Sequence, residues 1–327
     1  MEKYRNVIQL HQWLIEIESE GKNVAQAVSE HVVDFGSLIA KKKRIDRKSN
    51  LEFKLRILPA QKKVPIRKLK RRCYVENIWV WNLVRAYPFH KNQAVVYYPP
   101  KKKTHSPTLY HQFFLDPVSQ MLRSHGASFI HAAVLSWKGK GVVLLGPKGA
   151  GKSSLSAALI ELGFKYYGDE HPILSLEKGK VWGKSFPSAI ALDRNSKNYF
   201  HLWESKMNWH PDRGKFLLDP RKIKSNSIGK RCLVQTVIFL NPNEKAEYRV
   251  TPVPSLKAYG KLLEDYYLAV GDEPLLSKES IAHLDLVAKL VEQSRSVQLS
   301  YGGKKFREVA RVIQRELIDY PSKRRAA

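Results

Sequence analysis

One glycine-rich segment constrains the fold of this chain more than any other part of its sequence. Gly146, Gly151, Lys152 and Ser153 occupy the required positions of the pattern G-x-x-x-x-G-K-[ST]. The run VVLL at 142–145 precedes them and is apolar and rich in β-branched residues, as in a strand that is buried on both faces. The segment therefore predicts a strand that enters a glycine loop.

The residues after the loop have helical spacing. Leu155, Ala158, Leu159 and Leu162 recur at intervals of three and four residues, and Gly163 stands where a helix commonly ends. A strand, a glycine loop and a helix in succession form the context in which this pattern binds nucleotide phosphates. An accidental turn between a strand and a helix is the alternative, and the complete pattern with both flanks disfavours it.

The chemistry of phosphate binding accounts for the residue types in the loop. Glycines let the backbone curl so that successive N–H groups face phosphate oxygens, and the helix adds its positive N-terminal end. We predict that Lys152 contacts the β- and γ-phosphates and that the Ser153 hydroxyl binds Mg²⁺. The predicted nucleotide-binding residues are Gly146, Pro147, Lys148, Gly149, Ala150, Gly151, Lys152, Ser153 and Ser154.

Two acids follow the next predicted strand. The segment 165–167 is interpreted as the strand to which the helix returns, and Gly168, Asp169 and Glu170 come directly after it. Beside a phosphate loop, one acid can hold Mg²⁺ and the other can accept a proton. An idle, solvated acidic pair before Pro172 is the alternative.

Charge is the unusual feature of the composition. The 327 residues include 57 Lys and Arg against 30 Asp and Glu, a formal net charge of +27. Such a balance attracts acidic proteins, nucleic acid or anionic lipid, or it reflects a host whose proteins are basic throughout. The length is sufficient for two domains.

The sequence predicts a cytoplasmic protein. We find no export signal and no apolar run near the roughly 20 residues that span a bilayer. Cys73 and Cys232 are too few for a disulfide scaffold and lack metal-ligand spacing.

The N-terminal part is expected to be a small basic region. Its first 35 residues predict an amphipathic helix, because apolar residues recur at helical spacing. They are Val7, Leu10, Trp13, Leu14 and Ile17. In the basic region 41–72, apolar residues from Phe53 to Ile57 alternate with charges, which favours half-buried strands over a nucleic-acid arm.

Further elements follow from periodicity along the rest of the chain. Strands are predicted at 74–84, 94–98, 129–137, 233–240 and 297–300, and helices at 109–124, 256–269, 281–293 and 306–317. His131 falls inside the third of these strands, where a lone histidine is usually a core residue. The aromatic-rich segments 182–192 and 200–209 are either core or part of a substrate wall. Arg213 and Lys215 are cations that could reach a γ-phosphate.

With these pieces placed, residues 125–318 resemble the HPr kinase/phosphorylase-like family of P-loop kinases, and more narrowly its shorter relatives. The resemblance rests on IHAAV at 130–134, GVVLLGPKGAGKSSLSAAL at 141–159 and LGFKYYGDEHPIL at 162–174. It implies an α/β fold with a P-loop nucleotide-binding core of the HPr kinase/phosphoenolpyruvate carboxykinase type. The expected domains are a smaller basic N-terminal α+β region over 1–124, the kinase domain over 125–318 and a frayed tail over 319–327.

The resemblance also implies residue roles, with ATP and Mg²⁺ as cofactors. Asp169 corresponds to the first acid of the family's pair and is the candidate general base, with Lys152 on the terminal phosphates. His131 matches the family's histidine upstream of the loop. Glu170 stands where relatives carry an aspartate, and we predict that it is a metal ligand together with Ser153. Its side chain is one methylene longer than that of the aspartate.

The implied activity is a Mg²⁺-ATP-dependent serine kinase. The chain lacks the glycine-rich signature of true HPr kinases, so their second, phosphorylase activity is not transferred. Shorter relatives include kinases encoded beside lasso-peptide genes, which phosphorylate a serine of the precursor peptide. The resemblance therefore implies a peptide or protein substrate. An acidic substrate would complement the basic surface of this chain. The alternatives are a nucleotide-binding module or ATPase recruited to nucleic acid through residues 41–72, and a regulator that binds nucleotide without transferring phosphate. Oligomerisation stays open.

Overall fold

A computed structural model describes the chain in segments that fall into two units, residues 1–122 and 123–327. The boundary predicted between residues 124 and 125 lies in the turn that follows this division. The described residues are 3–11, 13–20, 51–59, 70–71, 73–78, 83–88, 92–98, 111–186, 188–197, 201–210, 214–243, 248–270, 278–302 and 305–319.

The first unit contains one mixed sheet. Among the residues described there, six strands have the order β1-β2-β3-β6-β5-β4. Their bounds are β1 Lys3–Leu10, β2 Trp13–Glu20, β3 Leu51–Pro59, β4 Cys73–Ile78, β5 Leu83–Pro88 and β6 Gln93–Tyr98. β3 is parallel to both of its neighbours, whereas the pairs β1–β2, β4–β5 and β5–β6 are antiparallel.

The two N-terminal strands show that the helix predicted for this segment is wrong. β1 and β2 form an antiparallel hairpin. In β2, Ile15 and Ile17 are buried while Glu16 and Glu18 are partly exposed, which is the two-residue period of a strand. The helical spacing was misleading because Trp13, Leu14 and Ile15 are consecutive apolar residues that fit either period.

The third strand has the alternation that the sequence predicts. Phe53, Leu55 and Ile57 are fully buried, and Lys54 and Arg56 between them are exposed. The basic region is therefore a half-buried strand where the structure describes it. Within the region 41–72, the structure describes only this strand and residues 70–71.

Several predictions fall outside the described residues. They are residues 41–50, 60–69 and 72 of the basic region, Arg213, and the tail after 319. The proposed nucleic-acid arm therefore stays a prediction.

The first unit ends in a helix, as the sequence predicts. Helix α4 (Asp116–Arg123) follows one π-helical turn, His111–Leu115, and together they account for the helix expected at 109–124. The Arg85 guanidinium on β5 donates to the Asp116 carboxylate at 2.7 Å, which ties the start of α4 to the sheet.

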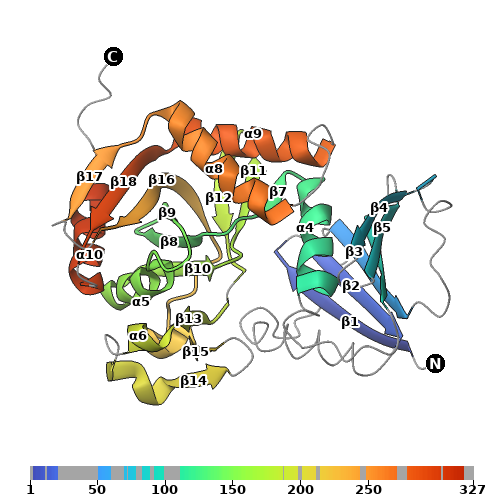
Figure 1. Cartoon of the computed structure of the whole chain (residues 1–327), viewed down its shortest axis with the longest axis horizontal. Coiled ribbons are helices and arrows are strands. Elements are labelled where there is room, and N and C mark those ends of the chain that lie inside the picture. The colour runs from blue at the N-terminus through green and yellow to red at the C-terminus, as the bar shows by residue number, and fades with distance from the viewer. Residues whose placement is uncertain are drawn as a thin grey trace. The chain divides into compact units, whose positions relative to one another are not determined.

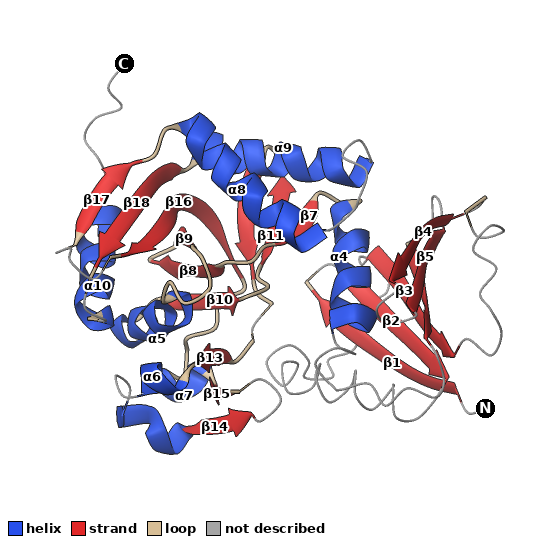
Figure 2. Ribbon diagram, viewed as in Figure 1, coloured by secondary structure: helices blue, strands red, loops and turns tan. Residues whose placement is uncertain are grey.

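The second unit is built on a larger mixed sheet, which curls visibly in Figures 1 and 2. In the part of this unit that is described, nine strands include the path β10-β8-β9-β16-β12-β11-β7, with β18 paired to β16 and β17 paired to β18. The bounds are β7 Ala127–Phe129, β8 Ala133–Trp137, β9 Lys140–Leu145, β10 Lys165–Asp169, β11 Ile173–Glu177, β12 Lys180–Lys184, β16 Arg231–Pro242, β17 Arg249–Pro252 and β18 Arg295–Tyr301.

Strand β16 explains the curl. Its first residues pair with β12 in antiparallel fashion, and its later residues pair with β18 in parallel fashion. A register shift between Val234 and Thr236 lies on its other edge, where β9 runs parallel to it. One strand thus divides its pairing between two neighbours, and the sheet bends there.

Helices cover both faces of this sheet (Figure 2). Helices α5 (Lys152–Leu162) and α10 (Phe306–Val312) pack on one face, and α8 (Ser255–Val270) and α9 (Lys278–Gln293) pack on the other. In β9, Val142 and Leu144 join the first core, while Val143 and Leu145 join the second. The prediction that this strand is buried on both faces is confirmed.

A smaller sheet lies beside α5. Its order is β13-β15-β14, with bounds β13 Ile190–Leu192, β14 Met207–His210 and β15 Lys215–Leu218. Short helical segments connect and follow these strands, namely α6 Arg194–Lys197, the 3₁₀ turn His201–Lys206 and α7 Pro220–Ile223. Ile190, Leu192 and Leu218 bury their side chains in the same core as α5.

Most other predicted elements are confirmed, with two corrections. The strands at 233–240 and 297–300 correspond to β16 and β18, the helices at 256–269 and 281–293 to α8 and α9, and the helix at 306–317 to α10 with the π-helical segment Ile313–Asp319. The strand predicted at 129–137 is confirmed over 133–137, which is β8, but residues 130–132 are not strand and separate it from β7. The strand at 74–84 is likewise two strands, β4 and β5. Among the described helices, none combines the length and apolar character needed to cross a membrane.

Candidate functional site

A cavity of about 860 Å³ lies where three parallel strands end. β9, β16 and β18 run in the same direction, so their carboxyl ends meet at one edge of the sheet. The residues that follow them, 147–154 after β9, 242–243 after β16 and 301–302 at the end of β18, all line the cavity. Ligands of open α/β sheets bind at such an edge, where loops diverge from strand ends.

The glycine loop has a backbone that only glycine adopts easily. Gly146, Gly149 and Gly151 have φ angles of 156°, 84° and 85°. Gly151 precedes the first residue of α5, and a Cβ there would lie 2.8 Å from both the Tyr301 hydroxyl and Phe306 Cε1. The close approach of two aromatic rings and the positive φ therefore both require glycine at 151.

Strand β18 holds the loop in place. The Tyr301 hydroxyl, which is buried, donates a hydrogen bond to the Ala150 carbonyl. Within the loop, the Ala150 N–H donates to the Pro147 carbonyl at 3.0 Å. The loop is thus fixed before any ligand binds.

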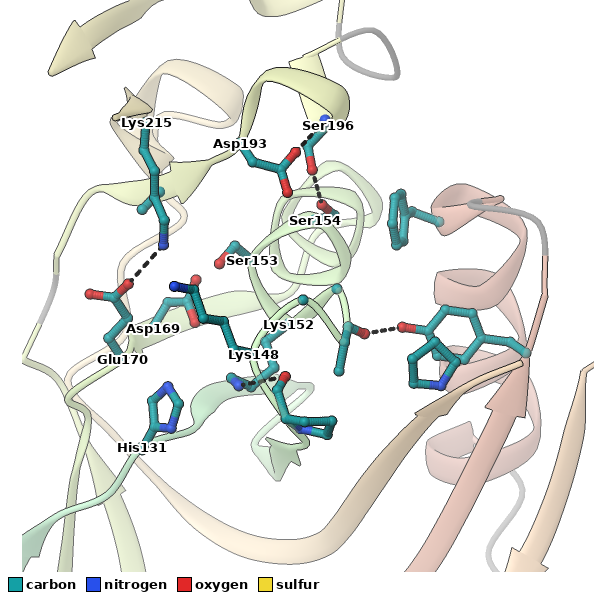
Figure 3. A pocket seen from close by; sticks show the side chains of 18 of the residues that line it. His131, Lys148, Lys152, Ser153, Ser154, Asp169, Glu170, Asp193, Ser196 and Lys215 are labelled. Carbon is teal, nitrogen blue, oxygen red and sulfur yellow. Dashed lines mark hydrogen bonds and ion pairs between the residues drawn. The ribbon is translucent and has the colours of Figure 1, made fainter. Parts of the chain in front are cut away.

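Lys152 turns its ammonium back onto its own loop. The side chain is buried, and its Nζ donates to the Gly146 carbonyl at 2.6 Å (Figure 3). A second loop carbonyl, that of Pro147, lies 3.5 Å from the same nitrogen. The charge is thereby held against the loop, and its predicted contact with phosphates stays a prediction.

Asp169 is a buried carboxylate in the same cavity. It is 2% exposed at the end of β10, and neither of its oxygens has a hydrogen-bond partner among the described residues. Burial raises the pKa of Asp169 from its ordinary 3.8 to about 6, and the charge of Glu170 adds to this rise. The hydroxyl of Ser153 and the ammonium groups of Lys152 and Lys215 oppose it.

The hydroxyl of Ser153 interacts with the Asp169 carboxyl without making a hydrogen bond of standard geometry. It lowers the pKa of the carboxyl, yet it does not satisfy either carboxylate oxygen. A buried charge without a partner costs free energy, so this arrangement calls for a function that uses it.

Glu170 lies in a different environment from its neighbour. About a third of its side chain is exposed, and its Oε1 lies 3.4 Å from the Lys215 Nζ on β15 (Figure 3). Its φ angle is 78°, in the left-handed region that non-glycine residues seldom adopt. The two acids are therefore separated, one buried and unpaired and one ion-paired at the cavity wall.

The cavity also contains His131. It lies in the bend between β7 and β8 and is exposed, so the expectation that it sits inside a strand is wrong. Figure 3 shows its ring below Glu170, on the side of the cavity that also holds Asp169. The structure thus brings the sequence-predicted catalytic, nucleotide-binding and metal-binding residues to one cavity, except Gly146, which does not line it.

Two residues that line the cavity were not identified from the sequence, namely Asp193 just before α6 and Ser196 on it. The Asp193 carboxylate accepts from the Ser196 N–H at 2.6 Å, and the Ser154 hydroxyl donates to the Ser196 hydroxyl at 3.0 Å. These bonds connect the first turn of α5 to the small sheet (Figure 3). An Asp three residues before a Ser is a local capping pattern, which could have predicted the turn but not its place at the cavity.

A further group was missed because it comes from distant segments. Pro242, Asn243, Tyr301, Gly302 and Phe306 line the cavity. The Asn243 N–H donates to the Tyr301 carbonyl at 2.8 Å, which joins the ends of β16 and β18. Polar and glycine residues after buried strands were the available signal, but only the parallel pairing shows that these ends meet.

The site does not contain a ready-made metal cage. In the described segments, no group of three or more His, Cys, Asp or Glu side chains is arranged to hold a metal ion. Mg²⁺ often binds through one or two carboxylates together with waters and substrate phosphates. The Glu170 carboxylate and the Ser153 hydroxyl, which both line the cavity, fit that sparser mode of binding.

Comparisons with known proteins find similarity among solved structures. No protein-family model matches the sequence, and no curated protein matches it. Among solved structures, the HPr(Ser) kinase/phosphatase from Coxiella burnetii has a TM-score of 0.32 and 14% sequence identity, over 58% of this chain and 97% of that chain. This likeness is too low to support a conclusion about activity.

Proposed function

We propose that this protein is a kinase that transfers the γ-phosphoryl group of Mg²⁺-ATP to a seryl hydroxyl of a peptide or protein. The observation that carries the proposal is the Asp169 carboxylate. It is buried, has no hydrogen-bond partner among the described residues, and shares a cavity with the glycine loop and Lys152. A base beside a phosphate-binding loop is what phosphoryl transfer to a hydroxyl requires.

The loop supplies the binding of the triphosphate. Residues 147–154, which include the N-terminal end of α5, line the cavity, so phosphate oxygens bound there would lie beside backbone N–H groups and the positive end of the helix. Lys152 would exchange the Gly146 carbonyl for oxygens of the β- and γ-phosphates. Lys215 would likewise exchange Glu170 for a γ-phosphate oxygen, since its ammonium lies at the cavity wall.

Ser153 and Glu170 are the residues that would hold Mg²⁺. The ion would neutralise charge on the β- and γ-phosphates. Ser153 begins the first turn of α5 after Lys152, and Glu170 is the more exposed of the two acids, with an arm long enough to contact Lys215. Asp169 is left to act on the acceptor.

Asp169 accepts the proton of the seryl hydroxyl. As the proton moves to the carboxylate, the seryl oxygen forms a bond to the γ-phosphorus, and the bond from that phosphorus to the bridging oxygen breaks, releasing ADP. A pKa of about 6 suits this step, because the group is ionised at neutral pH and basic enough to take a proton.

The volume of the cavity is compatible with two substrates. Small-molecule sites commonly measure about 300–1,000 Å³, and this one measures about 860 Å³. The choice of a seryl group on a peptide comes from the resemblance of the sequence to the shorter HPr-kinase relatives. The basic composition of the chain supports an acidic acceptor.

Labelled transfer tests the proposal. The protein is incubated with γ-labelled ATP, Mg²⁺ and acidic serine peptides, and any phosphorylated residue is located by mass spectrometry. Asp169→Asn should keep ATP affinity within about twofold and lose transfer by at least about a hundredfold, the usual size of a general-base effect. Retained transfer in this variant would contradict the role of Asp169.

A second variant tests the loop. Lys152→Ala should weaken ATP binding by about tenfold or more, since it removes a buried ammonium from the phosphates. Lys180→Ala, on an exposed residue that does not line the cavity, is the matched control. Equal ATP affinity in the Lys152 and Lys180 variants would contradict the assignment of the loop.

A further inference from the structure

We propose that the acceptor reaches the cavity as an extended acidic peptide that pairs with the edge of β14 opposite β15. This inference rests on the proposed kinase function, and it can be tested by binding alone. It identifies the docking surface as one strand, two lysines and one exposed tryptophan beside the cavity.

Strand β14 has an edge available for pairing. In the order β13-β15-β14 it is the outer strand, and within the described segments it pairs only with β15. Asn208 and Trp209 on it are exposed, and Trp209, at 39% exposure, is one of few large apolar side chains at the surface of the described residues. An edge strand presents unpaired N–H and C=O groups to which an extended peptide can add.

The edge leads to the cavity. His210, the last residue of β14, pairs with Lys215, whose ammonium contacts Glu170 at the cavity wall. The Arg194 guanidinium lies 4.8 Å from the centre of the Trp209 ring, and Arg194 follows Asp193, which lines the cavity. A peptide along β14 therefore has its next residues beside the site where a hydroxyl would meet Asp169. Figure 1 shows β14 on the small sheet, next to β15 and α6.

The charge beside this edge selects an acidic peptide. Lys206 precedes β14, and its Nζ donates to the Lys222 carbonyl at 3.1 Å, while the Lys222 Nζ donates to the Lys206 carbonyl at 3.1 Å. Both side chains are exposed, and the nearby Asp219 carboxylate, whose charge Lys222 also influences, is already ion-paired with Arg221 at 2.6 Å. Two ammonium groups held close together by carbonyls leave a positive charge that an acidic partner would neutralise.

Single-stranded nucleic acid is the competing occupant. It also uses exposed aromatic side chains and cations. A nucleic acid cannot complete a β-ladder, however, and the open backbone of β14 would then stay unpaired. The exposed edge therefore favours a peptide.

The test uses a fluorescent peptide and the full-length protein. The probe alternates glutamate with valine around a central alanine, so that it binds without being phosphorylated. A second probe has lysine in place of glutamate, and a third carries N-methyl groups on alternate backbone amides, which block pairing to a strand. We expect binding of the first probe, and binding at least about tenfold weaker for the other two.

Matched variants separate the edge from the general charge of the protein. Trp209→Ala and Lys206→Glu should each lower the affinity for the acidic probe by about tenfold. Lys180→Glu makes the same charge change at the start of β12 and should weaken it by less than about threefold. Because Trp209 also packs on Phe216, thermal unfolding of its variant is measured, and the N-methyl probe tests the edge without any substitution.

Three results would overturn the docking proposal. They are equal binding of the N-methyl probe, equal weakening by Lys180→Glu and Lys206→Glu, and tighter binding of a single-stranded DNA oligonucleotide that depends on Trp209. The serine form of the probe then separates docking from catalysis. Edge-dependent binding without transfer supports docking and contradicts the kinase. Transfer with a KM that Trp209→Ala and Lys206→Glu leave unchanged supports the kinase and overturns the docking.

Discussion

At the scale of single residues, the buried carboxylate of Asp169 makes the folded protein less stable, and the same carboxylate is the base of the proposed reaction. Its pKa lies above the value of an exposed aspartate because the carboxyl is buried, and no described hydrogen bond compensates for the burial. Below about pH 3.8 the group is protonated in both the folded and the unfolded chain and costs nothing. As the pH rises, the unfolded chain loses this proton first, so the cost grows and is complete above about pH 6.

Replacing Asp169 by asparagine should therefore stabilise the fold. The difference between 3.8 and about 6 corresponds to about 3 kcal/mol at neutral pH, at about 1.4 kcal/mol for each pH unit. Denaturant unfolding of the wild type and Asp169→Asn at pH 8 and pH 4 measures it. The gain should be present at pH 8 and nearly absent at pH 4. An equal gain at both values would show that the charge of Asp169 is not its source.

The pH dependence of the proposed reaction should depend on the same carboxyl. Because the base must be ionised, kcat/KM should rise with pH through about 6 and then level off. Glu170→Gln removes a like charge and should move this limb to lower pH, whereas Lys215→Met removes a cation and should move it to higher pH. If the pH profiles of the two variants shift in the same direction, or do not shift, the assignment of Asp169 as the base is contradicted.

At the scale of elements, the glycine loop depends on contacts from β18 and α10. Gly151→Ala places a Cβ 2.8 Å from the Tyr301 hydroxyl and from Phe306 Cε1, at a φ angle of 85°. We expect a loss of about 2–4 kcal/mol in the free energy of unfolding, from backbone strain and overpacking together. ATP affinity should fall as well, because the loop must shift.

Gly149→Ala is the matched control for this prediction. Its φ angle is 84°, nearly the same, but a Cβ there meets no atom within 4 Å. It should therefore cost only the backbone strain, about 1 kcal/mol. Thermal or denaturant unfolding of both variants measures the difference. Equal losses would show that the aromatic contacts do not hold the loop.

At the scale of the whole molecule, the two units should respond differently to nucleotide. Every residue that lines the cavity belongs to the unit 123–327. A ligand that binds only the folded state stabilises by about 2.7 kcal/mol at a hundredfold excess over Kd. Calorimetry with Mg²⁺ and a non-hydrolysable ATP analogue should therefore raise the transition of this unit and leave that of residues 1–122 in place. A shift of both transitions by equal amounts would mean that the units unfold together.

The sequence by itself determined the local parts of this protein. The glycine pattern, the buried strand before it and the acids at 169–170 could be located because each depends on residues that are adjacent or one helical turn apart. The long helices of the second unit and β16 follow from periodicity for the same reason. The N-terminal hairpin was misread where Trp13, Leu14 and Ile15 fit both a strand and a helix, so that only pairing between strands could decide.

Only the tertiary structure decided which distant residues share the cavity. Tyr301 and Phe306 contact the loop because β9, β16 and β18 are parallel and their ends meet, and pairing order is not written in any local pattern. The sequence likewise shows two adjacent acids, but burial distinguishes them, since Asp169 is enclosed while Glu170 reaches Lys215. Burial depends on what the rest of the chain packs against a residue, and for that reason the chemistry of this site became visible only in three dimensions.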